Sequence, residues 1–195
     1  MLYATKALDE LSYQVSISNF QFNAKLLGEI CDPHQKLVFF ALGKSYHAVK
    51  LAVSIANSYG LRWFVLDATN ALHGDCGIVG PKDILFFVSN SGTTKEVIKV
   101  ASHPLFNQNR KISMTSNRLS SLAKVCDINV ELSVTKENSP FGHAPMTSTL
   151  FQILFLNELI TKIVKDYNIS PQNYQQHHPA GAIGDAIFAD AEGRN

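Results

Sequence analysis

The apolar stretch Ile84–Val88 (ILFFV) runs directly into the polar stretch Ser89–Thr94 (SNSGTT), and this junction decides the fold. Consecutive apolar residues that are mostly β-branched or aromatic are typical of a strand covered on both faces, as in parallel sheets. In open parallel sheets, ligands bind beyond the carboxyl ends of the strands. The polar residues that follow Val88 are therefore the first place to look for a binding site.

Similar apolar stretches lie on both sides of this junction and alternate with segments of helical periodicity. The other expected strands are Leu37–Leu42, Trp63–Leu66, Lys111–Thr115 and Ile128–Leu132, and the expected helices are about Ser45–Tyr59, Thr94–Ala101, Leu119–Val125 and Met146–Tyr167. Gly60 is expected to end the first of these helices. The alternation predicts an α/β fold in which a parallel sheet of five strands carries helices on both faces, a three-layer α-β-α sandwich.

The length of 195 residues corresponds to one domain with a short appendage. We expect a single domain over residues 1–185 and a C-terminal tail over residues 186–195. Spaced apolar positions predict one or two amphipathic helices in an N-terminal segment, about residues 4–31. From Ser170 onward, prolines and glycines predict loops.

Composition excludes several classes of protein. The net charge is +1 and 17% of residues are charged, so no electrostatic bias favours nucleic acid or an anionic membrane. The most apolar stretch, Leu150–Val164, contains polar residues and is expected to be a buried helix, not a membrane span. The 3 cysteines are widely spaced, which argues against disulfides and a zinc site and favours a reducing compartment. Because the N-terminus also lacks the pattern of a secretory signal, we expect a cytoplasmic protein.

Three loops that follow expected strands carry hydroxyl groups: Gly43–Ser45, Ser89–Thr94 and Thr115–Asn117. Backbone N–H groups at a helix N-terminus, together with serine and threonine hydroxyls, suit a phosphate. The alternative is helix capping, which serine, threonine and asparagine provide without any ligand. We favour capping for Thr115 and Ser116, and ligand binding for Ser89–Thr94, where the polar side chains exceed what a cap needs. Neither a Walker loop nor a GxGxxG motif is present, so a nucleotide cofactor is not expected.

Six short segments occur in a recognisable order. They are Gly43–His47 (GKSYH), His73–Asp75 (HGD), Ser89–Gly92 (SNSG), Lys136–Pro140 (KENSP), Ala144–Pro145 with Thr147–Thr149, and His178–Gly184 (HPAGAIG). This series resembles the sugar isomerase (SIS) domain of arabinose-5-phosphate isomerases, which feed ketodeoxyoctulosonate synthesis for lipopolysaccharide. The resemblance extends from about Lys36 to Asp185.

The resemblance implies a parallel sheet of five strands and the interconversion of arabinose 5-phosphate and ribulose 5-phosphate through an enediol. The implied catalytic residues are Lys44, His73, Glu96, Glu137 and His178. The polar loops supply the candidate substrate-binding residues Gly43, Ser45, Ser89, Asn90, Ser91, Thr93 and Thr94. Acid, base and hydrogen-bond donors suffice for this reaction, so no redox cofactor and no metal are expected. In relatives the HPG segment helps to build a site between subunits, so a homo-oligomer, a tetramer, is expected.

Each catalytic candidate also has a structural interpretation. Thr93 and Glu96 have the spacing of a capping box, which leaves Glu96 evenly divided between a cap and catalysis. We take Glu137 as the general base, although a solvated loop carboxylate would be ordinary. We assign His178 to acid–base chemistry and His177 to a structural role, since neighbours in an extended chain point apart and no third metal ligand is evident.

Lys44 is expected to contact phosphate or a substrate oxygen rather than lie solvated at the surface. His73 is expected to donate a proton or to help open the sugar ring.

Several positions depart from the pattern of this family: Tyr46 stands where a small residue is usual, Thr93 and Thr94 stand where Glu-Ser is usual, Ala180 replaces a glycine, and His143 and Met146 interrupt the segment around Ala144. These departures affect the identity of the sugar more than the chemistry.

The pair of CBS domains found in many relatives is expected to be absent. Alternative functions are isomerisation of another phosphosugar, sugar-phosphate sensing without catalysis, and a structural subunit that binds a partner through the long C-terminal helix.

Overall fold

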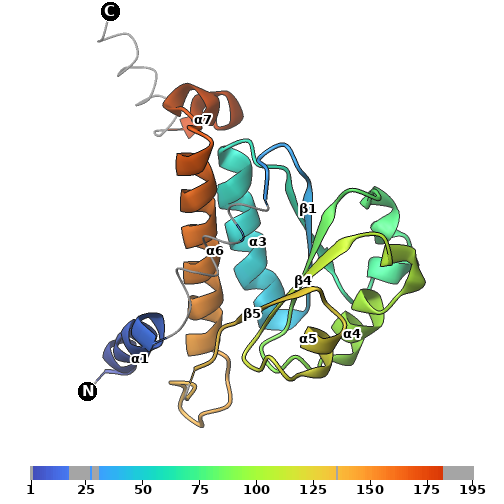
Figure 1. Ribbon diagram of the computed structural model, residues 1–195. Coiled ribbons are helices and arrows are strands. Elements are labelled where there is room, and N and C mark those ends of the chain that lie inside the picture. The colour runs from blue at the N-terminus through green and yellow to red at the C-terminus, as the bar shows by residue number, and fades with distance from the viewer. Residues whose placement is uncertain (1, 18–26, 28–30, 135, 182–195) are drawn as a thin grey trace, which may run out of the picture.

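The computed structural model describes residues 2–17, 27, 31–134 and 136–181 (Figure 1). Its centre is a sheet of five parallel strands, as predicted, in the order β2-β1-β3-β4-β5. The strands are β1 (Leu37–Ala41), β2 (Trp63–Asp67), β3 (Ile84–Val88), β4 (Arg110–Thr115) and β5 (Ile128–Glu131). Their bounds agree with the expected strands to within one residue.

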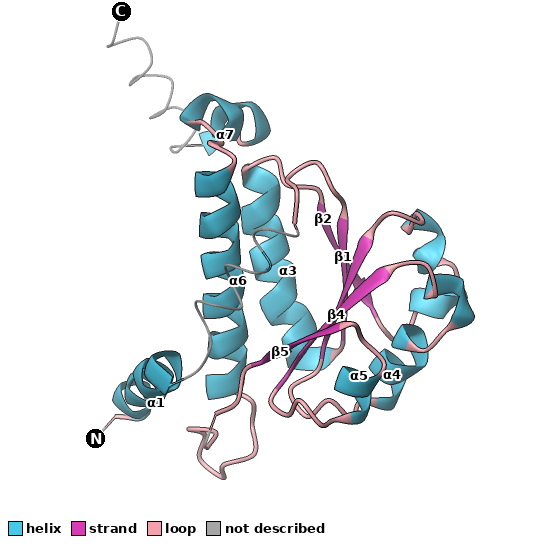
Figure 2. Cartoon of the chain, in the orientation of Figure 1, coloured by secondary structure: helices cyan, strands magenta, loops and turns pink. Residues whose placement is uncertain are grey.

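Helices cover both faces of this sheet, which confirms the predicted three layers. The helices are α1 (Tyr3–Ile17), α3 (Gly43–Ser58), α4 (Lys95–Ala101), α5 (Ser121–Lys124), α6 (Thr147–Asp166) and α7 (Pro171–His177), with short 3-10 turns η1 (Ala71–His73), η2 (Asp75–Ile78) and η3 (Pro104–Phe106). In Figure 2, α3 and α6 lie side by side on one face of the sheet, and α4 and α5 lie on the other.

Side chains of β1 and β3 alternate between two apolar clusters, which is why both strands are apolar throughout. Phe39 and Phe86 stack at 5.0 Å between ring centroids in the cluster that includes α3 and α6. Phe40 and Phe87 stack at 5.0 Å in the cluster that includes α4. Every residue of both strands is buried, so these strands fix the middle of the molecule.

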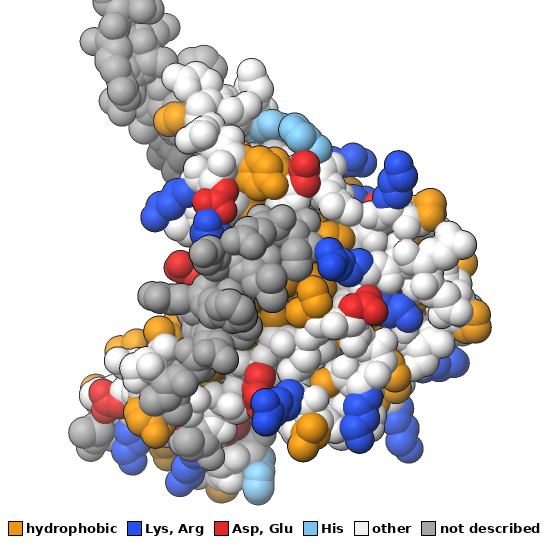
Figure 3. All heavy atoms as spheres, in the orientation of Figure 1, with side chains coloured by type: hydrophobic (Ala, Val, Ile, Leu, Met, Phe, Trp, Pro, Cys, Tyr) orange, Lys and Arg blue, Asp and Glu red, His pale blue; other side chains and the backbone are white. Residues whose placement is uncertain are grey.

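The expected stretch Leu150–Val164 lies within α6, which buries one apolar face in the core. No helix within the described residues is both long enough and apolar enough to cross a membrane. On the face shown in Figure 3, basic and acidic side chains are dispersed among uncharged surface.

The chain from Ser170 onward was predicted to be loop, and this prediction is wrong for residues 171–177, whereas residues 182–195 lie outside the described residues. Residues Pro171–His177 form α7, with Pro171 in the first turn. Ser170 accepts a hydrogen bond from the Asn173 N–H, and the Asn173 side chain accepts one from the Ser170 N–H. This reciprocal cap starts a helix that glycine and proline content alone did not suggest.

Two other bounds differ from expectation. Helix α3 begins at Gly43 rather than near Ser45, and the predicted helix Leu119–Val125 is only Ser121–Lys124. Gly60 follows the end of α3 with a positive φ of 79°, as expected of a helix stop. Of the expected N-terminal helical segment, α1 is described, whereas residues 18–26, 28–30 and the tail 186–195 lie outside the described residues.

Candidate functional site

The strand order places β1 at the point where the chain changes direction across the sheet. The chain passes from β1 to β2 on one side and returns to β3 on the other. Helix α3 after β1 and helix α4 after β3 pack on opposite faces, which opens a crevice at the carboxyl ends of these strands. A pocket of about 370 Å³ lies there, lined by Leu42, Gly43, Lys44, Ser45, Val88, Ser89, Asn90, Ser91, Thr94, Val97 and Pro145.

One wall of this pocket is the start of α3. Gly43 has a positive φ of 60°, and the residue before it, Leu42, makes no side-chain cap. The first N–H groups of an α-helix have no partners within the helix, and they carry the positive end of its dipole. Lys44 adds an exposed ammonium group beside them. This wall therefore favours an anionic group such as phosphate.

The opposite wall is the loop Ser89–Thr94, whose hydroxyl groups hold its shape. The buried Ser89 hydroxyl lies 2.8 Å from the Thr94 hydroxyl and accepts a hydrogen bond from the Gly92 N–H at 3.1 Å. The Ser91 hydroxyl accepts from the Thr93 N–H and from the Thr93 hydroxyl, at 3.2 and 2.9 Å. All the predicted substrate-binding residues except Thr93 line this one pocket: Gly43, Ser45, Ser89, Asn90, Ser91 and Thr94.

The loop that follows β4 supports this wall from behind, which the sequence did not indicate. Thr115 and Ser116 were expected to cap a helix, and this is wrong, because Ser120 is the N-cap of α5. Ser116 instead donates both its N–H and its hydroxyl to the Asn90 carbonyl, at 2.8 and 2.7 Å. Thr115 donates its hydroxyl to the Asn117 carbonyl.

Glu137 lies in the segment that leads into α6, the segment that also contributes Pro145 to the pocket. Its Oε2 atom accepts hydrogen bonds from the N–H groups of Thr147 and Ser148, at 2.8 and 3.3 Å. Its Oε1 atom is buried and has no hydrogen-bond partner among the described residues. The start of α6 thus holds one carboxylate oxygen, whereas the other is buried without a partner in the described part of the chain. Glu137 is not among the residues that line the pocket.

His73 and Glu96 lie at the carboxyl edge of the sheet but do not line the pocket. His73 ends the turn η1 after β2, and its side chain is exposed. Glu96 is exposed in the first turn of α4. The predicted capping box between Thr93 and Glu96 is not formed, since Thr94 is the N-cap and makes no side-chain cap bond.

His178 lies far from this pocket within the same chain. Its Nδ1 atom is 3.2 Å from the hydroxyl of Ser58, the last residue of α3, and its ring stacks on Tyr174. Lys44 is at the other end of α3, about 21 Å away at 1.5 Å per residue. One chain therefore does not bring His178 to the pocket.

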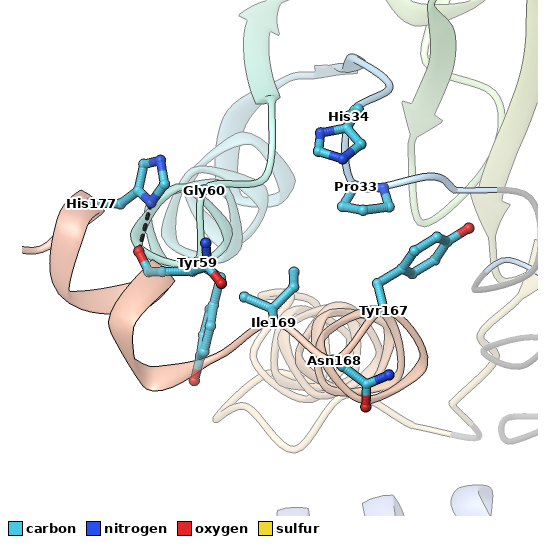
Figure 4. Close-up of a pocket in the computed structure, with 9 residues that line it drawn as sticks. Pro33, His34, Tyr59, Gly60, Tyr167, Asn168, Ile169 and His177 are labelled. Atoms are coloured by element: carbon cyan, nitrogen blue, oxygen red, sulfur yellow. Dashed lines mark hydrogen bonds between the residues drawn. The ribbon is translucent and has the colours of Figure 1, made fainter.

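His177 borders a second pocket at this far end. Figure 4 shows the His177 imidazole pointing toward Gly60, with its Nδ1 atom 2.7 Å from the Asn173 carbonyl oxygen. Tyr59 and Tyr167 line the same pocket, whose volume is about 370 Å³. Among the described residues, no group of three or more His, Cys, Asp and Glu side chains could hold a metal ion.

Residues 29–162 match the model of the SIS domain. The chain belongs to the SIS domain family. Among curated relatives, arabinose 5-phosphate isomerase KpsF of Escherichia coli is 30% identical over 178 residues, covering 91% of this chain and 54% of the relative. Arabinose 5-phosphate isomerase KdsD of Yersinia pestis is 32% identical over 154 residues, covering 77% of this chain and 46% of the relative. The chain thus spans about half the length of these relatives.

A solved structure has a closely similar fold. It is an E. coli CFT073 protein in complex with arabinose 5-phosphate, with a TM-score of 0.84 and 27% identity, covering 91% of this SIS chain and 94% of that chain. This similarity agrees with the fold described above. It also agrees with the membership of the chain in the SIS domain family.

Proposed function

We propose that this SIS protein is an aldose–ketose isomerase that interconverts arabinose 5-phosphate and ribulose 5-phosphate. The observation that carries the proposal is the pocket between β1 and β3, where the start of α3 faces the hydroxyl-rich segment Ser89–Thr94, here called the phosphate loop. The names of KpsF and KdsD, and the sugar-phosphate complex of the E. coli CFT073 protein, support this choice of sugar.

The phosphate is proposed to lie between the two walls of the pocket. Hydroxyl groups of Ser45, Ser89 and Ser91 can donate to its oxygens, and Lys44 can neutralise charge. Gly43 leaves room for a close approach because it carries no side chain. Anchoring the phosphate would leave the sugar carbons free to extend toward the surrounding loops.

Isomerisation moves hydrogen between adjacent carbons. A base removes the proton from C2 of the open-chain aldose while an acid protonates O1, which gives the enediol. Loss of the O2 proton and return of a proton to C1 give the ketose. The two sugars have the same composition and no electrons are exchanged with a third partner, so the proposed step involves no redox cofactor.

In this proposal Glu137 is the base, acting through Oε1. Oε2 is held by the start of α6, which orients the carboxylate, whereas Oε1 has no partner among the described residues. Lys44 and His73 would steady the enediolate oxygens or help to open the ring. Glu96 stays a candidate for proton transfer because it does not act as a cap.

We propose further that His178 reaches the pocket of a neighbouring copy, so that the enzyme is a homo-oligomer, a tetramer. Exposed apolar residues support a second copy as the partner: Met146, the N-cap of α6, and Leu150 and Leu154 within this helix recur every four residues on one face. Phe141 in the preceding loop is 87% exposed. A second copy packed on this face would bury these side chains. The proposed setting is a cytoplasmic step of lipopolysaccharide synthesis.

Two alternatives stay open. One is isomerisation of another phosphosugar in the same pocket, supported by Thr94, which lines the pocket and departs from the pattern of the family. The other is a sugar-phosphate sensor without catalysis. The two differ in whether the bound phosphosugar is turned over.

The test is isomerase activity on arabinose 5-phosphate, followed as ribulose 5-phosphate. Glu137→Gln and His178→Ala are each expected to lower kcat by about 100- to 10,000-fold, the range for loss of a general acid or base. Phosphosugar binding, measured by thermal shift, is expected to survive in both. Asp127→Asn and His34→Ala, at exposed positions away from the pocket, are the matched controls and should keep full activity. Tight phosphosugar binding by a wild-type protein without turnover would reject the proposed substrate.

A further inference from the structure

The Asn90 carbonyl is held more firmly than its neighbours in the phosphate loop. It accepts two hydrogen bonds from Ser116, one from the N–H at 2.8 Å and one from the hydroxyl at 2.7 Å. Both distances are those of well-formed hydrogen bonds, and both donors belong to a residue that directly follows a buried strand end. The direction of this carbonyl is therefore fixed from the β4 side.

A fixed carbonyl also fixes the next amide. The peptide unit is planar and trans, so the Ser91 N–H points opposite to the Asn90 C=O. Since the carbonyl points toward Ser116, the Ser91 N–H points away from it. Asn90 and Ser91 both line the pocket, and the Ser91 N–H has no hydrogen-bond partner within the described part of the chain.

A second contact keeps the loop seated on this support. The Leu122 N–H at the start of α5 donates to the Gly92 carbonyl at 3.0 Å. Gly92 also packs so closely on Ser120 that a Cβ atom there would lie 2.2 Å from the Ser120 hydroxyl oxygen. The backbone on both sides of Ser91 is thus held by the segment after β4, so that its N–H keeps one direction.

We propose that Ser116 is a positioning residue that aims the Ser91 N–H at a phosphate oxygen of the substrate. Ser116 does not line the pocket, and it acts through the Asn90–Ser91 peptide. The identity of the sugar in this inference rests on the proposed function. The binding of a phosphate at this loop does not. Without the hydroxyl, the Asn90 carbonyl keeps only one donor, and the peptide can rotate away from the orientation that binds phosphate.

The experiment compares wild type, Ser116→Ala and Ser116→Thr, with Ser16→Ala as the matched control. Ser16 also donates its hydroxyl to a backbone carbonyl, that of Tyr13. It lies far from Ser116 in the sequence. Ser116→Ala is expected to raise KM and the Kd for inorganic phosphate about tenfold, the equivalent of one hydrogen bond, while kcat stays within about twofold. Ser116→Thr, which keeps a hydroxyl, should restore both. In NMR spectra, phosphate should shift the Ser91 amide proton of the wild type, and this shift should be smaller in Ser116→Ala.

The outcomes separate this inference from the proposed function. An active wild type whose KM and phosphate Kd are unchanged in Ser116→Ala overturns the inference and leaves the isomerase proposal standing. A wild type that is inactive on arabinose 5-phosphate, but whose phosphate binding weakens in Ser116→Ala, supports the inference and overturns the proposed function. A general loss of thermal stability and of kcat in Ser116→Ala, or no phosphate binding by the wild type, overturns the inference.

Discussion

At the scale of single residues, the phosphate loop depends on a position that has no side chain. Gly92 has a φ of 64°, in the left-handed region that side chains disfavour. The space where a Cβ would lie is filled by Ser120, the N-cap of α5. Backbone conformation and packing therefore both require glycine between Ser91 and Thr93.

We predict that Gly92→Ala destabilises the protein by about 2 kcal/mol or more, the sum of left-handed strain and overpacking. It should also weaken phosphate binding, because the loop must move away from Ser120. Gly77→Ala is the control, since a Cβ at Gly77 meets nothing within 4 Å and its φ is not positive. Urea unfolding and phosphate titration of both variants check this, and equal stability of Gly92→Ala and Gly77→Ala would contradict it.

The cysteine thiols illustrate burial at the same scale. Burial raises the pKa of Cys31 to about 12, and it raises the pKa of Cys126 to about 12 as well. Both thiols should therefore stay protonated at pH 8 and react slowly with a thiol reagent until the protein is unfolded. Because these pKa values are higher in the folded state than the ordinary value of 9.0, stability should fall as pH rises from 9 toward 12. Labelling rates at pH 8 with and without urea test this, and fast labelling of the native protein would contradict it.

At the scale of helices and strands, the sequence predicts the elements that consist of continuous apolar segments. It does not predict an element that depends on a few polar contacts. The strands β1 and β3 are apolar throughout because both faces are covered, and this pattern is visible without the structure. Helix α7 was missed because it has no apolar periodicity and depends on the cap between Ser170 and Asn173. Over only seven residues, helical propensity is weak evidence that a helix forms. The cap between Ser170 and Asn173 acts locally and is what starts this helix.

The same contrast applies to the candidate site. The sequence could predict that Ser45 and most of Ser89–Thr94 line one pocket, because the carboxyl ends of parallel strands meet at one edge of the sheet. The role of Ser116 could not, since its partner is a backbone carbonyl 26 positions earlier in the chain. Serine before a helix suggests a cap, and only the three-dimensional path of the loop after β4 shows otherwise.

At the scale of the whole molecule, the two ends of α3 separate the proposed catalytic groups. Lys44 and the pocket lie at its start, and His178 lies beside Ser58 at its end. A helix of this length is rigid, so no small movement within one chain joins them. If both groups serve one reaction, they must come from different copies of the chain.

We predict that two inactive variants restore each other's activity. A mixture of Glu137→Gln and His178→Ala, dissociated and reassembled together, contains sites that take an intact Glu137 from one subunit and an intact His178 from another. Random assembly should give such a site in about one quarter of cases, and therefore about one quarter of wild-type activity. Reassembly of His178→Ala with the double variant Glu137→Gln/His178→Ala is the control and should stay inactive, because neither chain supplies the imidazole. If sedimentation shows mixed oligomers and the first mixture is still inactive, the two residues do not meet across a subunit boundary. If sedimentation shows a monomer, the shared site is rejected altogether.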